Sequence, residues 1–401
     1  MKKLSIMGLL LGLVFSVNIY SQETEKKIDK KAYEFTIVKE NPHTAVPNQY
    51  RSGTCWSFAG IGFVEAEILR ETGKSYNLSE MFIVRYAYSD KAKKYVRLHG
   101  SLNLGCGGVL NNVMYVIKNY GLIPDDFYRG LVINEEKHVH GEMDEVLKAY
   151  TDAVMKNGNR KLTPVWSKGF DALLDTYLGE IPAGFIIDGK SYNPKTFAEA
   201  TGFNPEMYID LGSYLDKELH KPFVLEIPDN WNWGFTYNLT LDEMIEVLDN
   251  ALDDGFTVGW GADVSEKGFS WKNGVAIVPE ENLSDLTGTE KEKWEALTAA
   301  EKTKSIYSFE EIVKEKNITP EMRQLAYDNY ETTDDHSMLI VGKATDQKGN
   351  KYYKVKNSWG TDDHIYHGYF FASEAYVKYK TINIFMHKDA VPKQIMKKLG
   401  F

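Results

Sequence analysis

The segment from Asn48 to Gly73 reads NQYRSGTCWSFAGIGFVEAEILRETG, and it places Cys55 directly before a run of periodic apolar residues. Apolar side chains recur there at spacings of three and four, while charged side chains fall on other faces, which predicts one amphipathic helix that ends at Gly73. Ser52 or Thr54 can accept hydrogen bonds from the free amides of the first turn. The Cys55 sulfur would then lie at the positive end of the helix dipole, where a thiol loses its proton more easily.

Cys55 has two interpretations. A free cysteine often packs as a small hydrophobe, which would make this one inert. Two neighbours favour a nucleophile instead. Gln49 lies six positions upstream, across a Ser-Gly turn that can fold its amide back toward the sulfur, and a side-chain amide beside a backbone N–H makes an oxyanion hole. Trp56 can form a wall of the same site.

This segment resembles the papain-like cysteine peptidases. In that family a Gln precedes a Cys-Trp-Ser/Ala-Phe motif by six residues, and the matching residues here are Gln49, Cys55, Trp56, Ser57 and Phe58. The motif is specific because several residue types fall at fixed offsets. The resemblance implies that Cys55 is the nucleophile and Gln49 the oxyanion donor.

A second informative segment lies near the C-terminal end of the chain. His336 opens an alternating apolar run, and a polar turn separates it from a second run at residues 351–356, which predicts a β-hairpin. Asn357 follows directly. The two side chains can therefore lie side by side across the ladder, with the amide carbonyl of Asn357 receiving the imidazole N–H.

The chain has nine histidines, and any one of them considered alone is more often a surface or core residue than a catalytic one. Together with Gln49, Cys55 and the Asn-Ser-Trp-Gly motif that begins at Asn357, His336 fits a catalytic role better, because an activated thiol needs a base and a group that orients the base. The resemblance implies that His336 is the general acid and base, that Asn357 orients it, and that the indole of Trp359 shields the pair from water.

The spacing indicates one branch of the family. His336 follows Cys55 by 281 positions, whereas papain and the cathepsins place their His and Asn roughly 130 to 150 residues after the Cys. A domain-sized insertion is therefore expected, and this layout resembles bleomycin hydrolase and aminopeptidase C. The implied fold class is α+β: a papain-like two-domain fold, with a helical left domain, an antiparallel β right domain and a large, mostly helical insertion.

Four segments are expected along the chain. They are a signal peptide at 1–21, a papain-like N-terminal lobe with the Cys55 helix at 22–129, a family-specific helical insertion with part of the β lobe at 130–331, and a C-terminal β lobe with the tail at 332–401. Within the third segment, residues 240–254 are predicted to form a helix and residues 256–262 a buried strand. The Trp231-Asn232-Trp233 sequence favours core or interface packing over a carbohydrate site.

A glycine-rich turn, Gly105-Cys106-Gly107-Gly108, precedes another helical pattern. Glycines allow the backbone to approach a neighbouring strand or a ligand closely. The resemblance implies that Gly107 and Gly108 line the cleft and bind the substrate backbone; a plain turn without ligand contact is the alternative. In the family the cysteine equivalent to Cys106 pairs with one three residues before the nucleophile. That position is Ser52 here, so this disulfide is not expected.

The N-terminal 21 residues have the pattern of a secretory signal peptide: Lys2 and Lys3, an apolar stretch from Leu4 to Ile19, and a plausible cleavage point after Ser21. An uncleaved membrane anchor is the alternative, although the apolar stretch is short for a membrane span. We therefore expect an exported protein, periplasmic or extracellular, with no membrane association after the signal peptide is removed.

The formal net charge is −10, which argues against a nucleic-acid partner bound through a broad basic face. We expect no cofactor and no metal. His364 and His367 are three residues apart but lie with two aspartates in a predicted loop, which is weak support for zinc. The expected partners are peptide substrates and further copies of the chain.

These features predict a cysteine aminopeptidase that acts through a Cys55 thioester. An endopeptidase on the same site and a non-catalytic papain-like binding scaffold are the alternatives. The resemblance further implies a homohexamer with an inner chamber, and an enzyme whose own C-terminal carboxylate lies in the cleft and receives the amine of the substrate. The basic ending, Lys397 to Phe401, departs from the short apolar tail typical of the family.

Overall fold

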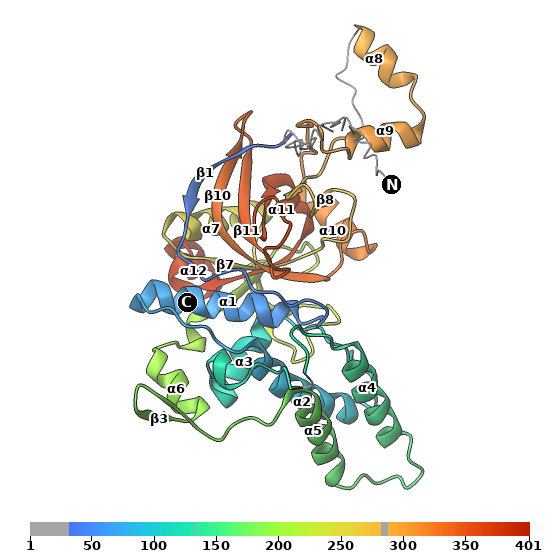
Figure 1. The fold of residues 1–401 in the computed structure, drawn as a ribbon. Helices are drawn as coiled ribbons and strands as arrows, with labels where there is room; N and C mark the ends of the chain where they lie inside the picture. The colour runs from blue at the N-terminus through green and yellow to red at the C-terminus, as the bar shows by residue number, and fades with distance from the viewer. Residues whose placement is uncertain (1–31, 133, 282–287) are drawn as a thin grey trace, which may run out of the picture. The chain divides into compact units, whose positions relative to one another are not determined.

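The computed structural model describes residues 32–132, 134–281 and 288–401, so the predicted signal peptide lies outside the described residues. Figure 1 shows a twisted sheet on one side, a group of helices on the other, and helix α1 (Cys55–Thr72) between them. We call these two groups the sheet lobe and the helical lobe. The combination confirms the predicted α+β class.

Helix α1 begins and ends where the sequence predicts. Gly73 adopts the left-handed conformation, with φ of 70°, and its N–H bonds to the carbonyl of Leu69. The predicted side-chain cap is wrong. Thr54 precedes the helix without capping it, because its hydroxyl is hydrogen-bonded to the Ser52 hydroxyl at 2.6 Å instead.

The amphipathic pattern of α1 does not correspond to an exposed face. Glu65 and Glu67 are only 6% and 1% exposed. Helix α1 packs against both lobes, and the carboxylates are satisfied internally: Glu65 accepts hydrogen bonds from the Leu78 N–H and the Thr44 hydroxyl, and Glu67 accepts two from Arg70. Buried carboxylates with such partners avoid most of the cost of desolvation.

The helices of the helical lobe share one apolar core. Helix α2 is capped by Ser79, whose hydroxyl accepts from the Phe82 N–H, and α3 follows the predicted glycine-rich turn and ends at Gly121. The lobe consists of α2 (Glu80–Arg97), α3 (Leu110–Tyr120), α4 (Gly141–Met155), α5 (Val165–Leu178), α6 (Pro194–Thr201) and a small hairpin of β2 (Phe185–Ile187) and β3 (Lys190–Tyr192).

The sheet lobe contains one sheet in the order β5-β6-β4-β13-β7-β10-β11-β12-β9-β8, with β1 paired to β10. The predicted C-terminal hairpin is confirmed as β10 and β11, which are antiparallel. The strands are β1 (Phe35–Glu40), β4 (Tyr208–Gly212), β5 (Pro222–Val224), β6 (Phe235–Asn238), β7 (Val258–Ala262), β8 (Phe269–Ser270), β9 (Val275–Ala276), β10 (His336–Asp346), β11 (Lys351–Lys356), β12 (Tyr369–Ser373) and β13 (Thr381–His387).

The sheet carries helices on its flanks: α7 (Leu241–Asp253), α10 (Pro320–Asp328), α11 (Glu374–Lys380) and α12 (Lys393–Leu399). The predicted helix at 240–254 is confirmed as α7, with the Thr240 hydroxyl capping the Glu243 N–H. The predicted insertion contains α8 (Gly288–Glu295) and α9 (Ala299–Ile306), and it also supplies β4, β6 and β7 to the main sheet. No helix within the described ranges is both long and apolar enough to cross a membrane.

Candidate active site

The fold brings the two informative segments of the sequence together. Cys55 is the first residue of α1, which packs against β10, and the backbone of Ser337 in that strand lowers the pKa of the Cys55 thiol. Ser337 follows His336 at the start of β10. The nucleophile and the base predicted from the sequence are therefore neighbours, although one comes from a helix of the N-terminal half and the other from a strand near the C-terminus.

His336 is held in one orientation by Asn357. Its Nε2 lies 2.7 Å from the Oδ1 of Asn357, and the N–H of Ser358 donates to the same oxygen at 2.8 Å. Because the Ser358 N–H needs an acceptor, the side-chain oxygen of Asn357, rather than its NH2 group, faces His336. Nε2 of His336 is therefore the protonated nitrogen, and Nδ1 is left as the basic one.

Gln49 is bound to the segment that follows Asn357. Its backbone N–H donates to the carbonyl of Ser358 at 2.8 Å, and its side-chain Oε1 accepts from the Ser358 hydroxyl at 2.5 Å. The amide is thereby oriented with its Nε2 group as the remaining donor. Trp359 covers the other side of the pair, with its ring centroid 4.8 Å from that of His336.

Comparison with known proteins agrees with this geometry. The description "Papain family cysteine protease" matches residues 30–161, and "Peptidase C1-like family" matches residues 288–400. The chain is a cysteine peptidase with a papain-like fold.

Relatives of this peptidase include aminopeptidases. Aminopeptidase C of Lactobacillus delbrueckii subsp. lactis is 24% identical, over 94% of this chain and 86% of the relative, and aminopeptidase C of Listeria monocytogenes is 22% identical, over 96% and 90%. The crystal structure of PepW from Lactobacillus rhamnosis HN001 superposes with a TM-score of 0.68 at 18% identity, over 91% of this chain and 84% of that one. These relatives support a cysteine aminopeptidase at the level of the family, and the structural likeness confirms the papain-like fold.

The surroundings of the peptidase site penalise a lone charge on either reacting group. Burial raises the pKa of Cys55 to about 12, and the negative charges of Asp334 and Asp229 raise it further. Burial lowers the pKa of His336 to about 4. The expectation that the helix dipole alone makes Cys55 acidic is therefore wrong, because desolvation outweighs it. Transfer of the thiol proton to His336 would create two opposite charges side by side, whose attraction offsets much of that penalty.

The glycine-rich turn packs against the start of α1, and its two predicted binding residues differ. Gly107 is half-buried, and a Cβ built on it would lie 1.9 Å from the Oδ2 of Asp229. Gly108 is buried, and a Cβ there would lie 2.8 Å from the Trp56 ring. The absence of a side chain at Gly108 allows close packing on Trp56. At Gly107 it allows the Asp229 carboxylate to approach the backbone.

Trp56 is fully buried, with its Nε1 donating to the carbonyl of Cys106 at 2.9 Å. The prediction that it forms a wall in contact with substrate is wrong, because its ring fills the space beneath the glycine-rich turn. Cys106 is a free cysteine, as expected from the Ser at position 52.

Three charged residues near the cleft are not among the predicted site residues: Asp229, Asp334 and Lys91. Lys91 is buried, and its ammonium donates to the carbonyls of Gly105 and Gly107 at 2.8 and 2.6 Å. Asp334 lies two positions before His336 in the sequence. This proximity could have indicated that Asp334 lies near the site. Asp229 comes from a loop more than a hundred residues away in the sequence, and only the fold places it here.

The C-terminal tail lies elsewhere. Helix α12 packs on the sheet lobe through the buried side chains of Ile395 and Leu399, and the ring of Phe401 lies 5.3 Å from that of Tyr237. The tail follows His387, the last residue of β13. His336 lies opposite Ala262 of β7, and Ala262 in turn lies opposite Thr381, the first residue of β13. The tail therefore begins at the end of β13 that is farther from His336. The expected tail in the cleft is therefore not found in this peptidase.

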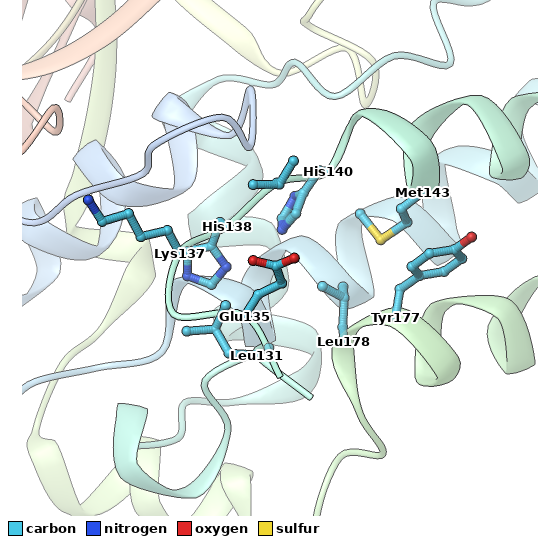
Figure 2. A pocket seen from close by; sticks show the side chains of 10 residues that line it. Leu131, Glu135, Lys137, His138, His140, Met143, Tyr177 and Leu178 are labelled. Carbon is cyan, nitrogen blue, oxygen red and sulfur yellow. The ribbon is translucent and has the colours of Figure 1, made fainter. Parts of the chain in front are cut away.

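Figure 2 shows a separate pocket beside α4 and α5, lined by residues that include His138, His140, Met143, Tyr177 and Leu178. None of the predicted site residues lines it. The Nδ1 atoms of both histidines are buried and have no hydrogen-bond partner among the described residues. Burial lowers the pKa of both rings to about 4, so the pocket holds neutral imidazoles at pH 7.

The residues described in the structure contain one cluster with metal-ligand spacing, formed by Glu67, Glu71 and His387 at the end of α1. Arg70 donates to both carboxylates, which accounts for them as an ion-paired group. His364 uses both ring nitrogens in hydrogen bonds with the backbone, so it is not arranged as a zinc ligand.

Proposed function

We propose that this peptidase is an aminopeptidase in which Cys55, His336, Asn357 and Gln49 carry the reaction. The observation that supports this most strongly is the bond between His336 and Asn357, which leaves Nδ1 as the basic nitrogen of His336 at the start of β10, the strand against which the Cys55 helix packs. The aminopeptidase relatives support removal of N-terminal residues.

In the proposed reaction the Cys55 sulfur attacks the carbonyl carbon of the first peptide bond while His336 takes the thiol proton. The carbonyl oxygen becomes negative and accepts hydrogen bonds from the Gln49 amide and from the Cys55 N–H, which has no partner within the helix. The C–N bond then breaks, His336 gives its proton to the leaving amine, and a thioester remains. Water attacks the thioester with His336 as the base, which releases the acid and restores the thiol.

The test compares hydrolysis of alanine 4-nitroanilide with that of its N-acetylated twin, before and after treatment with iodoacetamide. We expect the free-amine substrate to be preferred, and alkylation or Cys55→Ala to abolish the reaction. Equal cleavage of both substrates would favour the endopeptidase alternative. Absence of Cys55-dependent cleavage would favour the scaffold alternative.

We also propose that residues 1–21 direct export and are removed, on the basis of the Lys2-Lys3 and apolar pattern. N-terminal sequencing of protein recovered outside the cytoplasm should then begin at Gln22. A start at Met1 would contradict removal.

A homohexamer is proposed from the resemblance alone. Light scattering of the purified mature chain should give about six times its monomer mass, and a monomer mass would contradict it.

A further inference from the structure

One loop of the sheet lobe reaches across to the helical lobe beside the site. We call residues 226–234, between β5 and β6, the strap. On the sheet side, the carbonyl of Glu226 accepts from the Tyr327 hydroxyl at 2.7 Å. On the helical side, Trp231 packs edge-on against Tyr115 with ring centroids 5.8 Å apart, and the Lys94 ammonium lies 3.4 Å from the centroid of the Trp233 ring. The strap therefore joins the sheet lobe to the helical lobe.

The strap is held in one shape by its own hydrogen bonds. The buried side chain of Asn230 donates to the carbonyls of Leu225 and Gly234 at 3.0 and 3.1 Å and accepts from the Gly234 N–H at 2.9 Å. A side chain carried by this loop is consequently presented at a fixed place.

That side chain is Asp229. Its carboxylate lies directly against the Gly107 backbone, where no Cβ would fit, and its Oδ1 accepts from the Asn103 side chain at 3.0 Å. A peptide extended along the glycine-rich turn would meet this carboxylate. The strap thus places a negative group where a longer substrate would have to continue.

Asp334 provides a second carboxylate, from the segment that leads to His336. Its Oδ2 is buried and has no hydrogen-bond partner within the part of the chain that the structure describes. Burial raises its pKa well above the ordinary value, and the charges of Asp229 and Asp335 add to this. Lys91 partly balances Asp229. Asp334 therefore lacks a cation that would compensate a buried charge.

Both carboxylates also act on the Cys55 sulfur, since each raises its pKa. Asp229 lies against Gly107 in the turn that is bonded to Trp56, the residue after the nucleophile, and Asp334 lies two residues before His336. The two acidic groups therefore belong to the segments next to Cys55 and His336, and one of them has an unsatisfied oxygen. A group with positive charge and several donors would satisfy them.

We infer that Asp334 and Asp229 bind the N-terminal ammonium of the peptide substrate, and that the strap closes the cleft beyond the first residue. The inference rests on the proposed function and explains how N-terminal cleavage is selected when the C-terminal tail lies elsewhere. A substrate without this ammonium would leave the carboxylates unpaired, and a site built for a polar group rejects analogues that lack it.

The test measures kcat/KM for alanine 4-nitroanilide, N-acetylalanine 4-nitroanilide and Nα-acetyl-lysine 4-nitroanilide. The variants are Asp334→Asn and Asp229→Asn, with Asp126→Asn as a matched control because the Asp126 side chain is 81% exposed. Circular dichroism melts verify that each variant folds. We expect Asp334→Asn and Asp229→Asn to lower kcat/KM for the free-amine substrate by about 10- to 100-fold, with little change for N-acetylalanine, and we expect the control to match the parent enzyme.

Four outcomes would overturn the inference. If both variants lower kcat/KM equally for all three substrates, the carboxylates contribute to the reaction itself or to the fold, and not to binding of the ammonium. If Nα-acetyl-lysine 4-nitroanilide is cleaved with the same kcat/KM as alanine 4-nitroanilide, the acidic groups bind a lysine side chain and not the N-terminal ammonium. If the preference for the free-amine anilide over the acetylated one is unchanged in Asp334→Asn and Asp229→Asn, while Cys55→Ala abolishes cleavage, the inference fails and the proposed function stands. Lack of any Cys55-dependent cleavage in the parent enzyme would overturn both.

Discussion

At the scale of the residue, the site depends on a short chain of hydrogen bonds rather than on one unusual group. Ser358 fixes the amide of Asn357 through its N–H and that of Gln49 through its hydroxyl. Asn357 in turn fixes His336. The dipeptide Asn357-Ser358 therefore orients both His336 and the Gln49 amide, the proposed base and the proposed oxyanion donor, and all four side chains are buried.

Asn357→Ala should lower kcat/KM for the free-amine anilide by about 10- to 100-fold, because the imidazole loses the acceptor that fixes its orientation. Initial rates over a range of substrate concentrations measure this. Asn159→Ala, at an exposed position in the turn between α4 and α5, is the control. Rates equal to those of the parent enzyme would mean that Asn357 does not position His336.

His140 gives a prediction on pH. Its pKa is lowered to about 4 by burial, against about 6.5 in the unfolded chain. Because the folded pKa is the lower one, the neutral ring stabilises the fold above pH 6.5, and this contribution is lost as the pH falls toward 4. From pH 7 to 5, the free energy of unfolding should fall by about 1–2 kcal/mol more in the parent enzyme than in His140→Gln.

Urea titrations at the two pH values measure this difference. His99→Asn, at an exposed histidine, should behave as the parent enzyme does. An equal fall in all three proteins would show that the buried ring of His140 does not contribute.

At the scale of the element, the glycine-rich turn and α1 are coupled by the packing of Gly108 on Trp56. Gly108→Ala should lower the free energy of unfolding by about 1–3 kcal/mol, because the added methyl overpacks a buried aromatic ring. Gly141→Ala, where a Cβ meets no atom within 4 Å at the start of α4, should be neutral or slightly stabilising. Chemical unfolding of both variants makes the comparison, and equal stabilities would contradict the packing role.

The elements that could be predicted are those whose signals are local. Spacing of apolar residues and the stop at Gly73 located α1, and the alternation after His336 located the hairpin of β10 and β11. Burial of Glu65 and Glu67 could not be predicted, because it depends on α1 lying between two lobes. The role of Trp56 was missed for the same reason.

Among the proposed site residues, Cys55, Gln49, His336 and Asn357 could be predicted because they lie within short motifs. Asp229 lies in the strap, whose sequence signalled only packing through Trp231 and Trp233. Its position against Gly107 arises from a contact between residues far apart in the chain, so no local pattern indicated it.

At the scale of the whole molecule, the chain closes its cleft with an internal loop, while its C-terminus is anchored on the sheet lobe. Lys398 pairs with Glu243, and Gln394 bonds to Glu246, so that α12 is fixed to α7. The selection of N-terminal amines is consequently independent of the last residues in this account.

Removal of Gly400 and Phe401 should therefore leave the ratio of kcat/KM for the free-amine and acetylated anilides unchanged, since α12 ends at Leu399 and stays intact. The truncated and full-length enzymes are compared under the same conditions. Improved cleavage of the acetylated substrate after truncation would show that the tail enters the cleft.

The central claim is that Cys55 and His336 act as one pair, and the most direct measurement is the rate of alkylation of each cysteine by iodoacetamide at pH 7, followed by peptide mass spectrometry. Cys55 should be alkylated faster than Cys106, and His336→Ala should slow the alkylation of Cys55 by about 10- to 100-fold without affecting that of Cys106. A rate for Cys55 that is no higher than that of Cys106, or that does not depend on His336, would contradict the central claim.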